Sequence, residues 1–277
     1  LTEDGIRQSL RDVIIPLWNT YSFFVLYANV DSWSPGGAAS TTTHRLDRWI
    51  LSELQTLVQS INTEMEAYRL YRTVPAMVEF VEKLTNWYIR RSRRRFWKSD
   101  DDDDKTSAYG TLYSVLVTFV KMLAPVLPFV SESIYRNLVA STDEDAPGSV
   151  HLCDMPLVDD ALRDAGLEAQ MELAMKAVNL GRSLRNRHGL KTRQPLQRLF
   201  VLPPHKGSHL AVEEVSELLA EELNVKEVII VEDESDLSEV SYKPNFRALG
   251  PQFGARMKEV TSFISELNRE QVDRLAR

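Results

Sequence analysis

The chain has 277 residues, of which 43% are hydrophobic and 26% charged, so it has the composition of a folded globular protein and not of a disordered one. Its formal net charge of -7 excludes a uniformly basic nucleic-acid binder, although residues 1–99 are net positive and residues 100–277 net negative. The single cysteine excludes an intrachain disulfide, and no run reaches about eighteen apolar residues, so we expect a cytoplasmic protein with no membrane partner.

Apolar residues recur at helical spacing in five segments of the first half of the chain. The predicted helices cover residues 4–30, 44–68, 73–97, 107–123 and 131–138. We expect Pro16 to kink the first helix and Thr73 to cap the third. One-sided apolar stripes and short connections predict a mainly α fold with an antiparallel helical bundle over residues 1–140.

The second half of the chain changes its pattern. Residues 141–165 are acidic and contain Pro and Gly, which is typical of a linker. Beyond them the sequence predicts a small α+β subdomain over residues 166–277. Its expected elements are a helix near 167–184, strands at 199–202, 225–231 and 238–242, and helices at 211–223 and 253–267.

The most informative stretch is LTNWYIRRSRRRFW, residues 84–97. Residues 90–98 hold five arginines and one lysine without a carboxylate, and a tryptophan stands near the end of the run. Cations beside flat side chains bind phosphate backbones and stack on unpaired bases. The candidate binding residues are Arg90, Arg91, Arg93, Arg94, Arg95 and Trp97.

Helical spacing divides these candidates into two groups. At about 100° per residue, Arg91 and Arg95 continue the inner face of the helix, whereas the others point outward or sideways. For Arg91 and Arg95 the sequence leaves two interpretations open. They either join the anion site or extend past the core and pair with carboxylates of neighbouring helices.

Five aspartates, Asp100 to Asp104, follow the arginine run. They resemble an engineered cleavage tag together with Lys105, but their position between two well-patterned helices favours a native segment. A solvated acidic loop is the ordinary interpretation. The alternative is that the aspartates fold back on the arginines and weaken the basic patch when no ligand is bound.

A second basic stretch lies in the acidic half, where residues 173–212 contain no Asp or Glu. Arg182 and Arg185 are three residues apart and therefore lie on one side of a predicted helix. We interpret this stretch as a second anion-binding surface, and the alternative is a surface that only makes the chain more soluble. The chain carries no convincing catalytic or metal-ligating pattern, and the pair His151 and Cys153 has no partner pair to complete a metal site.

Several motifs together resemble isoleucyl-tRNA synthetase, a class I aminoacyl-tRNA synthetase, in its C-terminal anticodon-binding region. They extend over most of the chain, and the arginine run is the most specific of them. The combination looks most similar to the eukaryote-like subtype. The motifs are LDRWILSEL (46–54), MEAY (65–68), NWYIRRSRRRFW (86–97), LAPVLPFVSESIY (123–135), SVHL (149–152), LKTRQPL (190–196) and ELNVKEV (222–228).

The resemblance implies a parent enzyme that attaches isoleucine to its tRNA, using ATP with magnesium. Catalytic and editing domains would lie upstream in the same polypeptide, and their HIGH and KMSKS signatures are absent from these residues. This segment would hold the anticodon stem-loop of isoleucine tRNA, without catalytic residues, metal or cofactor of its own. The resemblance adds Lys191, Arg193 and Gln194 as tRNA-facing residues.

Two other classes of function remain open from the residues alone. A helical bundle can be a protein-interaction module, whose basic run would then meet an acidic protein. It can also be a general RNA-binding domain, in which case it would not distinguish isoleucine tRNA from other tRNAs.

Overall fold

The computed structural model describes residues 2–35, 43–97, 102–203, 212–232, 243–267 and 271. Lys98, Asp100, Asp101 and the predicted strand at 238–242 lie outside these residues. The chain divides into two compact units, Leu1–Ala169 and Gln170–Arg277.

The first unit consists of helices. They are α1 (Glu3–Ser9), α2 (Ile15–Val30), α3 (Arg45–Glu66), α4 (Leu70–Glu82), α5 (Arg90–Trp97), α6 (Asp102–Leu123) and α7 (Pro128–Tyr135). In the described residues of this unit, three π-helical stretches join or extend them, at Leu10–Ile14, Lys83–Ile89 and Arg136–Ala140. Short 3-10 turns lie at Val150–Leu152 and Asp160–Leu162.

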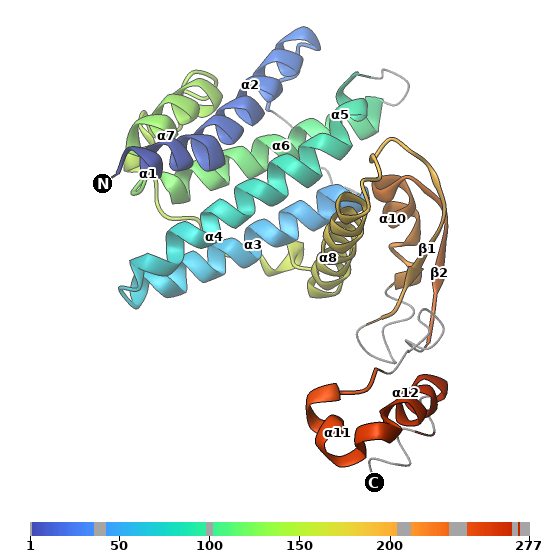
Figure 1. The fold of residues 1–277 in the computed structure, drawn as a ribbon. Helices are drawn as coiled ribbons and strands as arrows, with labels where there is room; N and C mark the ends of the chain where they lie inside the picture. The colour runs from blue at the N-terminus through green and yellow to red at the C-terminus, as the bar shows by residue number, and fades with distance from the viewer. Residues whose placement is uncertain are drawn as a thin grey trace. The chain divides into compact units, whose positions relative to one another are not determined.

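These helices pack as an antiparallel bundle. Helix α3 contacts α4 and α6, and Figure 1 shows α3 running opposite to the continuous α4–α5 helix, which in turn runs opposite to α6. The apolar stripes read from the sequence form the core, where Trp49, Ile50, Leu84 and Phe119 are fully buried. The expected mainly α fold with a small α+β part is confirmed.

Several predicted helix starts differ from the structure by three to five residues, including those at 131 and 211, which lie at Pro128 and Ser216. The third helix begins at Leu70, and the Thr73 hydroxyl donates to the Leu70 carbonyl inside its first turn (2.8 Å), so Thr73 does not cap it. Helix α6 begins at Asp102, so Asp103 and Asp104 belong to its first turn and not to a loop. Carboxylates are favourable there because the helix dipole is positive at its N-terminus.

The first helical segment, Glu3–Val30, is long and apolar enough to cross a membrane by length and composition. In the structure it packs in the bundle, where α2 contacts α6 and buries Leu17, Phe24 and Ala28. Only 28% of its most apolar stretch is buried, so much of the apolar surface of this segment is exposed. The π-helical turn Leu10–Ile14 lies just before Pro16, whose missing N–H interrupts the regular α-helical bonding.

Part of the acidic segment that follows α7, residues 141–165, is hydrogen-bonded to α3. The Pro156 carbonyl accepts a hydrogen bond from Asn62 (2.9 Å), and the Asp159 N–H donates to the Gln55 side chain (2.9 Å). These bonds place the segment within the first unit. The boundary between the two units falls inside helix α8, Ala165–Arg187.

The second unit contains two parallel strands, β1 (Leu196–Val201) and β2 (Val225–Ile230), with α10 (Ser216–Leu223) on the connection between them. The register pairs Leu196 with Val225 and Val201 with Ile230. Further along the chain lie α11 (Phe246–Phe253), a 3-10 turn at Gly254–Arg256 and α12 (Met257–Glu266). A β-α-β crossover is the usual connection of parallel strands.

Candidate nucleic-acid interface

The arginine run occupies the last turns of the α4–α5 helix. Arg90, Arg93 and Arg94 are exposed, as their helical spacing predicted, and Arg91 is half-buried. Among the described residues, Arg93 and Arg94 make no hydrogen bond or ion pair. Arg90 lies along its own helix, donating to the Asn86 carbonyl (2.7 Å) with its guanidinium 5.8 Å from the Trp87 ring centroid.

Arg95 points into the bundle instead. Its guanidinium contacts the Asp47 carboxylate at 2.6 Å and the Asp104 carboxylate at 2.6 Å, and only 10% of its side chain is exposed. Burial by itself lowers the pKa of Arg95, but the hydrogen bonds that Arg95 donates to both carboxylates outweigh it and hold that pKa above its ordinary value. In the structure Arg95 therefore pairs with carboxylates of neighbouring helices, which is the second of the two interpretations that its sequence position left open.

Two further side chains complete this cluster. The Tyr88 hydroxyl donates to Asp47 Oδ1 (2.9 Å), and Ser107 Oγ lies 3.2 Å from the second oxygen of the same carboxylate. Burial and the charge of Asp47 raise the pKa of Tyr88 well above its ordinary value. Asp104 shows that part of the acidic run folds back, and it does so onto the inward Arg95.

Trp97 lies at the end of α5 with 56% of its surface exposed. One side of its ring meets Tyr27 of α2, at a centroid distance of 6.4 Å. The preceding Phe96 is buried and packs edge-on against Phe23 and Tyr109, each at 5.0 Å. The end of the helix is therefore anchored by one aromatic ring and presents another to solvent.

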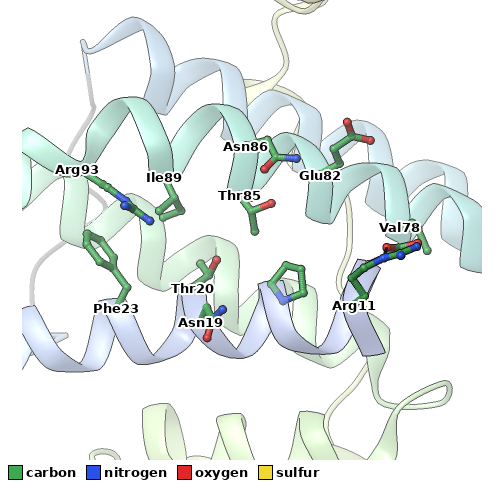
Figure 2. A pocket seen from close by; sticks show the side chains of 12 residues that line it. Arg11, Asn19, Thr20, Phe23, Val78, Glu82, Thr85, Asn86, Ile89 and Arg93 are labelled. Atoms are coloured by element: carbon green, nitrogen blue, oxygen red, sulfur yellow. Dashed lines mark hydrogen bonds and ion pairs between the residues drawn. The ribbon is translucent and has the colours of Figure 1, made fainter. Parts of the chain in front are cut away.

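A groove of about 520 Å³ runs between α2 and the α4–α5 helix. Figure 2 shows Arg93 reaching into it beside Phe23, with Asn19 and Asn86 on its two sides. Glu82 also lines it, so its lining holds both signs of charge as well as these two amide groups. Arg93 therefore belongs both to the exposed basic face and to the wall of this groove.

In the second unit, Arg182 and Arg185 of α8 are engaged internally. Arg182 forms an ion pair with the nearly buried Glu222 at 2.7 Å. Arg185 is only 4% exposed, and its guanidinium donates to backbone carbonyl oxygens, including that of Leu223 (2.6 Å). The spacing argument placed both on one side of a helix, but that side faces α10 and the start of β2. The Arg185 guanidinium is therefore unavailable to RNA in this conformation.

Lys191, Arg193 and Gln194 lie in the loop between α8 and β1, and all three are exposed. The structure thus gives two groups of accessible candidates, one in each unit. The first comprises Arg90, Arg93, Arg94 and Trp97 on α5, and the second is this loop.

Sequence reasoning missed two residues that shape these surfaces. Asp47 receives Arg95, and Asn224 adopts a left-handed backbone (φ 49°) at the end of α10, with its amide directed at the basic loop. An Asn directly after an apolar helix, as in ELNV, is a signal for a left-handed helix end. Asp47 carries no local signal, since its partner is distant in sequence. In the part of the chain that the structure describes, no group of three or more His, Cys, Asp or Glu is placed to hold a metal ion.

Comparison with known proteins places this arrangement in a family. Residues 47–200 match the family model described as the anticodon-binding domain of tRNA ligase. Isoleucine–tRNA ligases of Treponema denticola, Protochlamydia amoebophila and Treponema pallidum are 40%, 41% and 42% identical to the chain over 99% of its length. The chain spans 26% of the length of each of these relatives. Because the family model covers more than half of the chain, the chain belongs to the anticodon-binding domain family of tRNA ligases.

Proposed function

We propose that this chain is the tRNA-binding part of an isoleucine–tRNA ligase and that it holds the anticodon stem-loop of isoleucine tRNA. The family match supports tRNA binding, and the names of the relatives support the amino acid. The whole enzyme would join isoleucine to tRNA in the cytoplasm, using ATP with magnesium. Its catalytic and editing domains would be other parts of the same polypeptide.

The observation that carries this proposal is the state of Arg93 and Arg94. Both are exposed at the end of α5, and neither forms an ion pair with any residue that the structure describes. Exposed arginines in globular proteins usually have carboxylates among their neighbours. Two adjacent cations without an ion-pair partner in the described part of the chain are suited to the phosphates of an RNA backbone.

The test is binding of the chain to transcribed isoleucine tRNA across a series of salt concentrations. If Arg93 and Arg94 each neutralise a phosphate, R93A/R94A weakens binding and makes the slope of log Kd against log salt shallower by about 1.5–2. The control is R72A/R136A, which removes two exposed arginines that already have carboxylate partners. An R93A/R94A slope equal to that of the unaltered chain would contradict the proposal.

A second comparison separates a ligase domain from a general RNA binder. The chain is titrated with isoleucine tRNA and with a non-cognate tRNA of the same length at one salt concentration. Tighter binding of isoleucine tRNA supports the ligase assignment. Equal affinity for both supports a general RNA-binding domain, since phosphate contacts carry no sequence information.

A protein-binding face is the second candidate, and α2 favours it. Residues 15–30 carry no charge, and the exposed side of this helix presents Ile15 (52% exposed), Trp18 (42%) and Leu26 (58%). Apolar faces of this kind mark interaction sites. We propose that another domain of the same polypeptide packs here.

The test is binding of those domains, supplied as a separate polypeptide. W18S/L26S should abolish their binding and leave tRNA affinity unchanged, and undiminished binding of the domains would contradict this role.

A further inference from the structure

The loop that carries Lys191 is held from inside by one buried guanidinium. Arg185 Nη1 donates to the Lys191 carbonyl (2.9 Å) and to the Gln194 carbonyl (3.0 Å). Its Nη2 donates to the carbonyls of Leu223 (2.6 Å) and Asn224 (3.3 Å) at the end of α10. Arg185 therefore joins both ends of the loop to the left-handed helix end that precedes β2.

The two middle carbonyls of the loop are held by Asn224. Its Nδ2 donates to the Thr192 carbonyl (3.3 Å) and to the Arg193 carbonyl (3.0 Å). The backbone of Asn224 is left-handed (φ 49°, ψ 56°), a conformation that glycine adopts most easily. An asparagine at this position supplies an amide that glycine lacks. Its side chain therefore has a role beyond ending the helix.

These bonds determine what the loop presents to solvent. All four carbonyl oxygens from Lys191 to Gln194 accept bonds from Arg185 or Asn224, while all four side chains are exposed. The outward groups are thus an ammonium, a guanidinium, a hydroxyl and an amide. Carbonyl oxygens, which repel phosphate, are turned inward.

The electrostatic surroundings act in the same direction. Arg185 is buried, and among the described residues no carboxylate lies within ion-pairing distance of its guanidinium, so its charge adds to that of the loop. Residues 173–212 contain no Asp or Glu. Oriented donors around a fixed positive charge form a receptor for anions.

We propose that residues 191–194 form a preorganised phosphate-binding loop for the RNA backbone, and that Arg185 and Asn224 are its positioning residues. The proposal rests on the proposed tRNA binding and extends it. It assigns the ligand of this loop as phosphodiester groups. In this proposal Arg185 and Asn224 do not contact the RNA. They keep the carbonyl oxygens of the loop turned away from it.

The test is a double-mutant cycle on the full chain with transcribed isoleucine tRNA. K191A/R193A removes the outward cations and should weaken binding and make the salt slope shallower by about 1.5–2. N224G removes the amide while keeping a backbone that suits glycine, and should weaken binding about threefold to tenfold in the unaltered chain. In the K191A/R193A background N224G should change affinity less than about twofold, because the groups that it positions are already gone.

Asn224→Gly is preferred to a variant of Arg185, because loss of a buried guanidinium with four carbonyl partners endangers folding of the unit. The thermal unfolding midpoint of N224G should stay within about 3 °C of the unaltered chain. Amide hydrogen exchange at Gln194, whose N–H donates to the Lys191 carbonyl (3.0 Å), should become faster in N224G.

The outcomes separate this inference from the proposed function. An equal loss of affinity from N224G in both backgrounds means a general structural effect, and it overturns the positioning role while leaving tRNA binding intact. No effect of K191A/R193A overturns the phosphate-binding loop, whereas the response of R93A/R94A still reports whether α5 binds tRNA. If neither K191A/R193A nor R93A/R94A weakens tRNA binding, both proposals are contradicted.

Discussion

Arg95 and Asp47 form an ion pair of 2.6 Å in which the Asp47 side chain is fully buried and that of Arg95 is 10% exposed. Asp47 lies in the first turn of α3 and Arg95 in the last turn of α5, so the pair joins the beginning of one helix to the end of another. Tyr88 donates to the same carboxylate. This cluster fixes the rotation of α5, and thereby the outward direction of the neighbouring Arg93 and Arg94.

The first prediction concerns removal of this carboxylate. Asp47→Ala leaves a buried guanidinium whose one remaining carboxylate partner among the described residues is Asp104, and we expect the free energy of unfolding to fall by about 3 kcal/mol. Urea unfolding of the chain measures this change. Asp154→Ala, which removes an exposed aspartate, is the control and should stay within about 0.5 kcal/mol. A loss below about 1 kcal/mol for Asp47→Ala would show that the pair contributes little to stability.

The second prediction is a pH dependence that arises from Asp31 at the end of α2. Hydrogen bonds donated by Lys105 and Tyr109 hold the pKa of Asp31 below its ordinary value of 3.8, and the bond from Lys105 has the larger effect. A carboxyl whose folded pKa is lowered stabilises the fold above its unfolded pKa, and this stability is lost as the pH falls through the folded pKa. We therefore expect Asp31→Asn to be less stable than the unaltered chain at pH 6.

This difference should shrink as the pH falls below about 4, where the unaltered carboxyl becomes protonated. Urea unfolding at pH 6, 4 and 3 measures it, with Asp154→Asn as the control for a general effect of charge. A stability difference that is the same at all three pH values would mean that the Asp31 charge does not stabilise the fold.

The sequence alone predicted which arginines of the run point outward and which points inward. A period of 3.6 residues separates outward Arg90, Arg93 and Arg94 from inward Arg95, and the structure agrees. The sequence did not predict the ion-pair partner of Arg95. Asp47 is 48 positions away, and only the packing of α3 on the bundle brings the two together. Local periodicity gives the direction of a side chain, whereas its partner depends on tertiary structure.

The second basic stretch shows the same division. Spacing placed Arg182 and Arg185 on one side of a helix correctly. Nothing in the local pattern indicated that this side faces α10, since that depends on the crossover that pairs β1 with β2. The tRNA and isoleucine assignments came from the resemblance of motifs and not from any physical pattern, because charge and aromatic content indicate only an anionic partner.

The third prediction tests the close packing of α8 on α10. A Cβ atom added at Gly181 would lie 2.5 Å from Leu223 Cδ1 and 2.8 Å from its Cδ2, and Leu223 is itself buried. We expect Gly181→Ala to lower the free energy of unfolding of the second unit by about 1–3 kcal/mol through overpacking. Unfolding should be followed by circular dichroism, because all five tryptophans lie in the first unit.

Gly110 offers a matched control within α6. A Cβ added there meets no atom within 4 Å, so Gly110→Ala should stabilise the first unit by about 0.5–1 kcal/mol through its helix propensity. Equal effects of the two substitutions would contradict the close approach at Gly181. Opposite signs would confirm that space, and not the loss of glycine itself, decides the outcome.

The fourth prediction separates stacking from phosphate contact at the end of α5. Trp97 is 56% exposed and carries no charge, so its replacement removes a stacking surface without removing a phosphate contact. We expect Trp97→Ala to weaken binding to isoleucine tRNA about fivefold to a hundredfold and to leave the salt slope unchanged. Trp18→Ala, which removes a tryptophan that is 42% exposed on α2, should leave both unchanged. A shallower salt slope in Trp97→Ala would mean that the ring acts by holding the arginines in place, whereas unchanged affinity would exclude Trp97 from the RNA surface.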